Sequence, residues 1–419
     1  MQILKSSSFF RDRRLLALAV LGFASGLPFP LTFSMLSAWL FEAGINIKSV
    51  AAMTMVGLPY TIKFLWAPLK DHMELGWLTK KFGRRRGWLF LVQALLIFSL
   101  FMLAKSDPMT HLGWMAFWAF TVTLLSASQD IVIDAYRVDI VPQEMAGIAS
   151  SMATLGYRIG VLLSTAGVLY MAEFIAWADV YRIMAAIMIL PFICLFILPE
   201  PENPAMPKAT SVKGWIEKAV IVPLKDLLLH KDAIWLLVLV ICFRLPDFLL
   251  GAMANPFYLA MGFSKIEIAN ISKIFGFVMT ILGAFAAGII LSKWRWRFST
   301  CLILFTVLNS LSNLLYVLLA YKGHDPLYLT IAIIGENIAS ALSTTAFLAY
   351  LASLCKREFS ATHYAVLSSL AMLSRPLFGW VAGPLVESYN WDGFFAISAV
   401  LGIPALLLLV VLRRRGSII

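Results

Sequence analysis

Acidic side chains in the middle of long apolar stretches are the residues of this sequence best suited to chemistry. Asp130 and Asp134 lie four positions apart, so a helix would place them on one face. Glu336 lies in a later apolar stretch. Burial and neighbouring negative charge make a carboxyl group easier to protonate at ordinary pH. We therefore expect Asp130, Asp134 or Glu336 to carry protons. A static ion pair, above all between Asp130 and Arg158, is the structural alternative.

Basic side chains match these acids in number. A guanidinium group can hold a carboxylate through two parallel hydrogen bonds, so Arg158, Arg244 and Arg375 are candidates for binding an anionic ligand. In Arg244-Leu-Pro-Asp247 both signs of charge flank a proline, which predicts an interrupted helix lining a cavity. Pairing of Arg244 with Asp247 is the alternative. The eight charges in apolar surroundings are Lys63, Arg158, Arg244, Arg375, Asp130, Asp134, Asp247 and Glu336.

Long apolar blocks must position these charges. The chain of 419 residues is 61% hydrophobic and 14% charged, whereas soluble proteins carry about 25% charged residues. About 20 helical residues cross the hydrocarbon core of a membrane. We therefore predict an all-α membrane protein with twelve transmembrane helices in two six-helix bundles. The expected spans are 15–41, 48–68, 87–105, 110–136, 146–172, 178–198, 232–260, 265–292, 298–321, 326–354, 361–386 and 393–412.

Basic residues predict the orientation of these spans. Of the 34 Lys and Arg residues, 24 fall in alternate connections that we assign to the cytoplasm, and 6, Lys273 among them, fall on the opposite side. Cytoplasmic loops are enriched in Lys and Arg, so both termini are expected in the cytoplasm. This topology accounts for the net charge of +11 without nucleic-acid binding. The four cysteines show neither paired nor metal-ligand spacing, and we expect no disulfide, metal or cofactor.

The two halves of the sequence resemble each other weakly. Leu27-Pro28 and Leu245-Pro246 are each followed, sixteen residues later, by a glycine, Gly44 and Gly262. Two other pairs of positions recur at nearly the same offset. Such repeats predict two halves related by an axis along the membrane normal, with a substrate cavity near the midplane between them.

A long connection separates the halves. We expect an N-terminal six-helix bundle at 1–198, a cytoplasmic linker at 199–231 and a C-terminal six-helix bundle at 232–419. Within the linker, 212–229 alternates apolar residues with lysines, which favours an amphipathic helix lying on the membrane surface. A disordered linker is the alternative.

Two further features concern the first three spans. Gly22 and Gly26 lie one helical turn apart, which permits close helix packing; lining a substrate path is the alternative. The connection after the second span is basic, and we expect Lys63, Asp71 and Arg84 to form a gating loop. Basic clusters of this kind also attract anionic lipid headgroups.

Several motifs resemble those of a known family. The layout of twelve spans and the charged loop after the second span resemble the major facilitator superfamily, although this loop is about ten residues longer than the superfamily's usual pattern. Within it, the sequence is similar to the AmpG-type muropeptide permeases, and related acetyl-CoA transporters carry a similar fourth-span element. The motifs are Ser25-Gly-Leu-Pro28, Trp66-Ala-Pro-Leu69, Gly83-Arg-Arg-Arg-Gly-Trp88, Ser128-Gln-Asp-Ile-Val-Ile-Asp-Ala-Tyr-Arg137 and Gly156-Tyr-Arg-Ile-Gly160.

The resemblance implies a proton-coupled importer of N-acetylglucosaminyl-anhydro-muramyl peptides, working in the bacterial inner membrane and not as an enzyme. A monomer is expected. A sugar-peptide needs aromatic stacking, hydrogen bonds to hydroxyl groups and cations for its carboxylates. The expected substrate-binding residues are Phe29, Phe33, Gln129, Tyr157, Arg158, Arg244, Asp247 and Arg375. A transporter of the same fold with another cargo, such as acetyl-CoA, a nucleotide or a drug, is the alternative.

Overall fold

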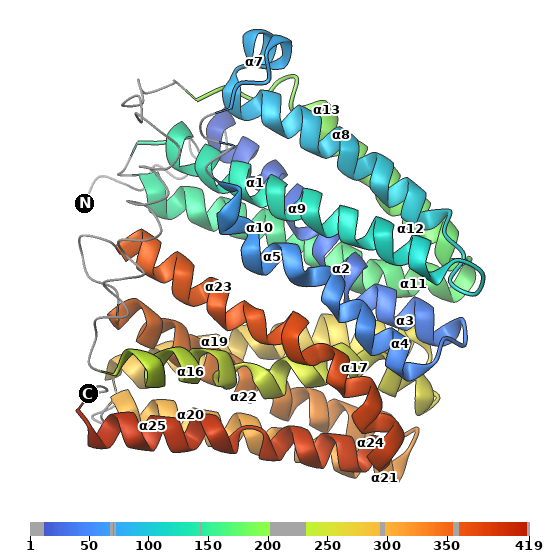
Figure 1. Ribbon diagram of the computed structural model, residues 1–419, viewed down its shortest axis with the longest axis vertical. Helices are drawn as coiled ribbons and strands as arrows, with labels where there is room; N and C mark the ends of the chain where they lie inside the picture. The colour runs from blue at the N-terminus through green and yellow to red at the C-terminus, as the bar shows by residue number, and fades with distance from the viewer. Residues whose placement is uncertain are drawn as a thin grey trace. The chain divides into compact units, whose positions relative to one another are not determined.

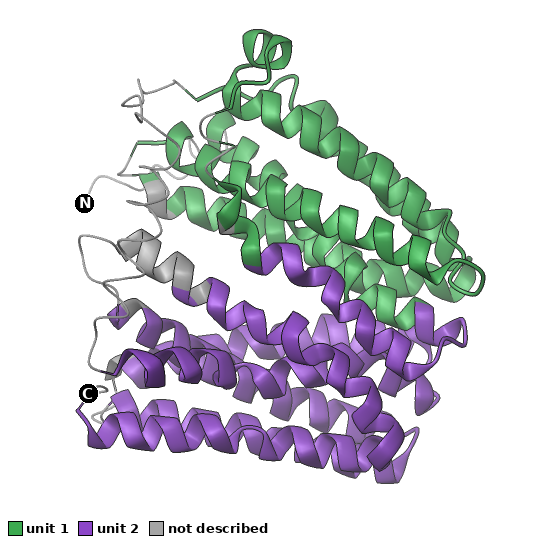
Figure 2. Cartoon of the chain, in the orientation of Figure 1, with its two compact units in different colours: residues 1–39, 62–210 green, residues 40–61, 211–419 purple. Residues whose placement is uncertain are grey.

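The computed structural model describes residues 12–67, 70, 73–142, 145–201, 232–293, 298–354 and 360–416. All secondary structure in these ranges is helical (Figure 1). The helices form two compact units, unit 1 with residues 1–39 and 62–210, and unit 2 with residues 40–61 and 211–419 (Figure 2). The amphipathic helix expected at 212–229 lies outside the described residues.

The predicted transmembrane helices are confirmed. Ten described helical stretches are long and apolar enough to cross a membrane, and a shorter apolar stretch, Ile47–Ile62, coincides with the expected second span. The stretch Ser369–Arg414 contains the last two expected spans, which the chain separates at Asn390, where φ is +56°. The fold is thus the expected twelve-helix arrangement.

Unit 1 contains the helices of spans one and three to six. Its elements are α1 (Arg13–Gly26), α2 (Pro28–Thr32), the start of α3 (Ser34–Glu42), η3 (Lys63–Leu65), α7 (Trp77–Phe82), α8 (Arg84–Ala104), α9 (Leu112–Ile140), α10 (Ala146–Leu162), η5 (Leu163–Gly167), α11 (Val168–Phe174), α12 (Trp177–Ile187) and α13 (Ile189–Cys194).

Unit 2 contains the last six spans and most of the second. Its elements are α4 (Ile47–Ala52), η2 (Met53–Gly57), α5 (Leu58–Ile62), α16 (Ala233–Phe243), α17 (Leu245–Ala260), α18 (Lys265–Glu267), η7 (Ile268–Phe275), α19 (Gly276–Lys293), α20 (Phe298–Ser312), α21 (Leu314–Lys322), α22 (Pro326–Ser353), α23 (Ser360–Phe378), η9 (Gly379–Val381), α24 (Ala382–Val400) and α25 (Ile403–Arg414).

Glycines bring α1 and α10 into backbone contact. A Cβ atom on Gly22 would lie 2.1 Å from the carbonyl oxygen of Ala153. In the opposite direction, a Cβ atom on Gly156 would lie 1.9 Å from the carbonyl oxygen of Ala19. One turn further along, Gly26 and Gly160 repeat this arrangement. The prediction of close packing at Gly22 and Gly26 is confirmed, because no side chain fits at these positions.

The first span of each half is interrupted at a proline, and the two prolines occupy equivalent positions in the sequence repeat. Helix α1 ends at Gly26 and Pro28 opens α2, and α16 ends at Phe243 before Pro246 in the first turn of α17. The glycines sixteen residues after these prolines also correspond, since Gly44 has φ +81° and Gly262 has φ +87°. Left-handed backbone of this kind favours glycine. The weak sequence repeat therefore marks equivalent structural positions.

Among the described residues, four spans contain a 3₁₀ or π-helical segment. The second and eleventh spans contain the 3₁₀ segments η2 and η9, and the fifth and eighth contain the π-helical segments η5 and η7. These are the middle spans of the four successive groups of three. π-helical turns are rare and frequently occur at functional sites.

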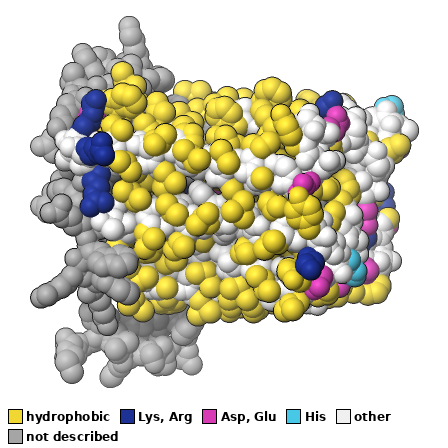
Figure 3. Space-filling view, turned by 90° about the horizontal axis from the view of Figure 1, so that it is seen from below, with side chains coloured by type: hydrophobic (Ala, Val, Ile, Leu, Met, Phe, Trp, Pro, Cys, Tyr) yellow, Lys and Arg dark blue, Asp and Glu magenta, His cyan; other side chains and the backbone are white. Residues whose placement is uncertain are grey.

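The surface has the character of a membrane protein. The face in Figure 3 carries a broad apolar band, with a group of basic side chains at one end and basic, acidic and histidine side chains together at the other. Large exposed apolar residues along α20, α21 and α25 include Leu311, Leu318 and Leu407. A lipid-facing surface requires such side chains, because hydrocarbon offers no partner to polar groups.

The glycine contact predicts a sharp difference between two glycine substitutions in unit 1. Gly156→Ala forces α1 and α10 apart, and overpacking of this kind costs at least about 1–3 kcal/mol. Gly113→Ala is the matched control, because a Cβ atom there meets nothing within 4 Å. Thermal unfolding of the purified variants in detergent should show a lowered midpoint for Gly156→Ala alone. Equal midpoints would contradict the contact.

Candidate functional site

A pocket in unit 1 brings together residues that the sequence singled out. It has a volume of about 230 Å³ and is lined by residues of α1, α9 and α10, three helices that contact one another. Helix α9 contributes Asp130, Asp134 and Arg137, and α10 contributes Tyr157. The complete lining is Gly22, Ser25, Asp130, Ile133, Asp134, Arg137, Ala153, Thr154 and Tyr157. The presence of Gly22 means that one glycine both packs against α10 and lines the pocket.

Asp130 is held from two directions. Its carboxylate accepts a hydrogen bond of 2.6 Å from the hydroxyl group of Ser25 on α1. The ammonium group of Lys63 acts on it electrostatically, as does the like charge of Asp134. We expected Arg158 as the partner, but the structure places Arg158 on an exposed side of α10 and assigns these contacts to Ser25 and Lys63.

Asp134 occupies a different environment from Asp130. It forms an ion pair with Arg137 at 3.2 Å, one turn along the same helix, and its side chain is 61% exposed. At about 1.5 Å per residue, Asp130 lies about 15 Å from the end of α9 and Asp134 about 9 Å from it. The two acids therefore share the pocket, with Asp130 at its deeper part and Asp134 nearer the opening of the helix bundle.

The other expected ligand-binding residues of unit 1 are dispersed. Gln129 is fully buried and donates a hydrogen bond of 2.9 Å to the carbonyl oxygen of Ala24, which ties α9 to α1. Phe29 and Phe33 contact each other with ring centroids 4.6 Å apart, and Phe33 is buried. Tyr157 alone of the expected aromatic residues lines the pocket.

Residues of the basic segment after the second span connect the start of α8 to other parts of unit 1. Arg85 forms a buried ion pair of 2.8 Å with Asp139 at the end of α9. The carboxylate of Glu200 accepts hydrogen bonds from the backbone N–H groups of Arg85 and Arg86, at 2.8 and 3.0 Å. Burial raises the pKa of the Glu200 carboxyl group, although these two hydrogen bonds oppose the shift. The Glu200 carboxylate thus caps the N-terminus of α8, where negative charge is favourable.

The expected gating residues divide between described and undescribed positions. Lys63 belongs to η3 and acts on Asp130, whereas Asp71 lies outside the described residues. Arg84 opens α8 directly after Gly83, whose φ is +85°. Beside them Lys70 is buried, with its ammonium group 3.8 Å from the ring centroid of Trp88, and burial lowers its pKa to about 8.

Unit 2 holds a second group of charges around the break between α16 and α17. Arg244 lies 3.6 Å from Asp247 and donates a hydrogen bond of 2.5 Å to Thr344 on α22. Asp247 also accepts a hydrogen bond of 2.7 Å from Asn309 on α20. The expected break at the Arg244-Leu-Pro-Asp247 motif is confirmed. Pairing of Arg244 with Asp247, left open by the sequence, is what the structure contains.

Glu336 belongs to this group, together with a lysine that the sequence analysis misplaced. Asn337 donates a hydrogen bond of 2.7 Å to Glu336, and the charges of Asp247, Lys273 and Arg244 act on it. We counted Lys273 with the residues outside the membrane. It lies instead eight residues into its span, where it donates a hydrogen bond of 2.8 Å to Asn255 on α17. Arg375 lies on α23 and is partly exposed.

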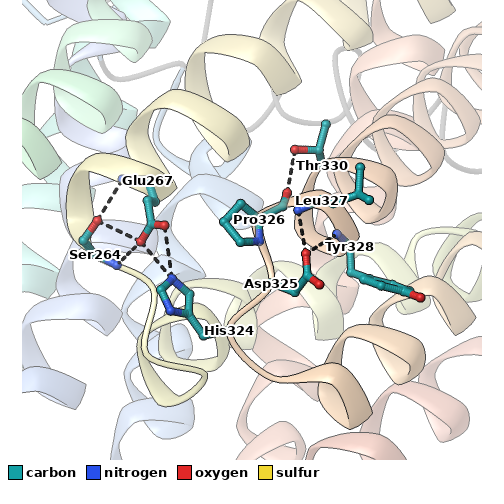
Figure 4. A network of polar contacts seen from close by, with 8 residues as sticks. All are labelled: Ser264, Glu267, His324, Asp325, Pro326, Leu327, Tyr328 and Thr330. Carbon is teal, nitrogen blue, oxygen red and sulfur yellow. Dashed lines mark hydrogen bonds and ion pairs between the residues drawn. The ribbon is translucent and has the colours of Figure 1, made fainter.

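Two turns of unit 2 carry a separate polar network at the ends of the helices (Figure 4). Ser264 and Glu267 form a capping box at the start of α18. His324, from the turn before α22, lies 3.1 Å from both oxygens of Glu267. Nearby, Lys265 pairs with Glu42 at 2.6 Å. These contacts stabilise the turns at the helix ends and do not involve the charges within the spans.

The geometry defines what each group of charges can do. Charge within a membrane span is costly and faces the bundle interior or water, where it marks ion and substrate pathways. Unit 1 offers an acid in a pocket with a hydroxyl donor and a cation, which suits reversible protonation. Unit 2 offers two cations and two acids, which suits an ionic ligand. Charged groups held within membrane spans in this way are typical of transporters.

Comparisons with known proteins agree with this geometry. The sequence profile of the Major Facilitator Superfamily matches residues 73–312. The chain is 37% identical to the Putative transporter AmpG 4 of Rickettsia felis, over 98% of this chain and 99% of that protein. It is 36% identical to the Anhydromuropeptide permease of Escherichia coli strain K12, over 97% of this chain and 81% of that protein.

A solved structure supports the fold. The crystal structure of a D-xylose-proton symporter superposes with a TM-score of 0.72 at 14% identity, covering 96% of this chain and 97% of that one. The chain belongs to the major facilitator superfamily and, within that class of multi-pass membrane transporters, to the AmpG-type permeases.

The ion pair of Arg85 and Asp139 should matter more than an exposed pair in the same unit. The two side chains are 4% and 18% exposed, so Asp139→Asn should cost about 3 kcal/mol. The matched control is Asp179→Asn, because Asp179 and its partner Arg182 are about half exposed and such a pair contributes about 1 kcal/mol or less. Thermal unfolding in detergent measures both. A larger effect at Asp179 would contradict the assignment.

Proposed function

We propose that the chain imports anhydromuropeptides from the periplasm to the cytoplasm and couples this import to protons. The similarity to the Anhydromuropeptide permease of Escherichia coli, at 36% identity over 97% of this chain, carries the choice of cargo. Membership of the AmpG-type permeases supports the same cargo. The alternative of another cargo, such as acetyl-CoA, a nucleotide or a drug, is tested by the experiment below.

Asp130 is the proposed proton-coupling residue of unit 1. It lines the pocket, lies in mid-span and accepts a hydrogen bond from Ser25. A carboxyl group in such a position can alternate between its charged and neutral forms, since Lys63 favours the charge while the surrounding span disfavours it. Asp134, exposed and paired with Arg137, is better placed to pass protons between Asp130 and water.

Substrate contacts are proposed on both units. In unit 1, Tyr157 lines the pocket and is 36% exposed, and an aromatic ring of this kind can stack on a sugar. In unit 2, Arg244 lies beside Phe248 and is 19% exposed, so it combines a cation with an aromatic surface. Arg158 and Arg375 remain proposed contacts for carboxylate groups.

The arrangement in the cell follows from the same proposal. The bias of 24 against 6 basic residues supports two cytoplasmic termini in the bacterial inner membrane. The matched breaks at Pro28 and Pro246 support two repeat-related halves, 1–198 and 232–419. We further propose that the monomer is the working unit and that nucleic acid is not a partner.

Uptake of labelled anhydromuropeptide into proteoliposomes tests the cargo and the coupling together. A gradient of one pH unit, acidic outside, supplies about 1.4 kcal/mol per proton and should raise accumulation up to about tenfold. Asp130→Asn should abolish this accumulation while cargo exchange without a gradient persists, because an uncharged site can still admit cargo. Asp179→Asn, at an exposed surface pair, should behave as wild type.

Each part of the proposal has its own contrary result. Accumulation that ignores the pH gradient in the wild type would reject proton coupling. Accumulation by Asp130→Asn equal to that of the wild type would remove Asp130 from the coupling path. Uptake of acetyl-CoA or a nucleotide, without uptake of anhydromuropeptide, would reject the cargo.

A further inference from the structure

Lys273 is a charged residue in mid-span for which the proposed function has no role so far. It lies in the π-helical segment η7, about 12 Å along its span from Lys265 at 1.5 Å per residue. Its ammonium group reaches Asn255 at 2.8 Å and lies 6.0 Å from the ring centroid of Tyr258. Both contacts are with α17, so the side chain points toward the other helices of unit 2.

The neighbours of Lys273 are themselves fixed. Asn255 is buried, and the hydroxyl group of Tyr258 lies 3.0 Å from that of Tyr316 on α21. The side chain of Ser272 also interacts with that of Tyr258, so η7 lies beside α17. Lys273 therefore projects from a rigid surface, and an ordered surface of this kind loses little entropy when a ligand binds.

Lys273 and Glu336 attract each other without touching. Each acts electrostatically on the other, yet neither forms an ion pair within 4.0 Å in the part of the chain that the structure describes. An ammonium group has three N–H donors, and Asn255 is its one hydrogen-bond acceptor among the described residues. The other two N–H donors have no acceptor among the described residues, so they can bind an acceptor that carries negative charge.

The other charges around Glu336 come from several helices. Arg244 and Asp247 face it from the break between α16 and α17, and they are 3.6 Å apart. Tyr258 on α17 and Tyr316 on α21 also feel its charge. Arg244 already forms an ion pair with Asp247. Lys273 is therefore the cation whose positive charge is compensated most directly by Glu336.

We propose that Lys273 binds a carboxylate group of the cargo, and that Glu336 competes with the cargo for Lys273, so that a proton on Glu336 strengthens cargo binding. This inference rests on the proposed function, since it takes the cargo to be an anhydromuropeptide. A muropeptide carries a carboxylate on the muramyl lactyl group or on the peptide attached to it. The proton enters as a neutral carboxylic acid at Glu336, and no covalent bond changes in the cargo.

Thermodynamic linkage makes the effect reciprocal. If protonation of Glu336 raises the affinity for cargo by some factor, bound cargo raises the proton affinity of Glu336 by the same factor. Proton and carboxylate then occupy unit 2 together and leave it together. Coupling of this kind needs no contact between the proton and the cargo, because Lys273 transmits it.

The test is a cycle of protein variants and chemically altered cargo. Binding of anhydromuropeptide, and of the same compound with its carboxyl groups converted to amides, is measured by calorimetry on the purified protein. The wild type should bind the acid about 10- to 100-fold more tightly, the range expected for a charge-assisted contact. Lys273→Met should lose most of this preference, because the other proposed carboxylate contacts remain in the variant. Lys322→Met, at the exposed end of α21, is the matched control and should keep the wild-type preference.

A second variant tests the proton. Glu336→Gln mimics the protonated acid, so its affinity for the acid form should be high and independent of pH, whereas wild-type affinity should fall as pH rises. Thermal unfolding verifies that Lys273→Met and Glu336→Gln remain folded, and replacement of a buried charge by an uncharged side chain of similar size is often tolerated.

The outcomes separate this inference from the function on which it rests. A wild type that binds neither compound overturns the proposed cargo, and the inference with it. A Lys273→Met variant that is folded and keeps the preference for the acid overturns the inference alone. Affinity of Glu336→Gln that still falls with pH overturns the competition between Glu336 and the cargo.

Discussion

The direct contact between the backbones of α1 and α10 is the constraint on which unit 1 depends. Gly22 and Gly156 each face a carbonyl oxygen of the other helix, at a distance that no side chain could enter. Within hydrocarbon, helices gain nothing from hiding apolar surface, and close packing of small residues is a main source of their association. Because α1 and α10 approach so closely, Tyr157 of α10 lines the same pocket as Ser25 of α1, which donates a hydrogen bond to Asp130. Stability and chemistry in unit 1 thus have a common origin.

Charge within the spans is managed differently in the two units. In unit 1 the mid-span acid rests on a hydroxyl donor, with a lysine acting from further away. In unit 2 Arg244 and Asp247 are paired and further fixed by Thr344 and Asn309, which is the arrangement expected for ions that must be satisfied inside protein. Lys273 and Glu336 are left apart. Charges that pair with each other and charges that stay apart therefore occur in the same bundle.

Hydropathy was enough to predict the spans, because about 20 consecutive apolar residues are a long and redundant signal. The repeat was weaker, yet the paired prolines and glycines mark equivalent breaks and turns, since only a few residue types suit such backbone. Partners were harder to predict. Depth along a helix suggested Arg158 for Asp130, but a partner also depends on the angle at which helices pack, and that angle depends on Gly156 and Gly160. Ser25 lies one turn from Gly22, on the face of α1 that packs against other helices. Its position on that face could have suggested it as a partner for Asp130, whereas depth along the helix could not.

Lys273 was misplaced because it was counted with the side of the membrane on which its span begins, although the expected span 265–292 already placed it eight residues deep. It lies in the π-helical segment η7. A π-helical turn accommodates more residues than a turn of α-helix does, so η7 behaves like an insertion that has been absorbed without a loop. Deleting one residue there would restore α-helical geometry and leave the flanking helix in place, with Gly276 and Gly283 still against Asn337 and Ile338 of α22, so the change would fall on the residues within η7, Lys273 among them. Length at this point of the chain is therefore as specific as residue identity, and homologous transporters that bind ligands in the same way should share the extra residue even where its side chain differs.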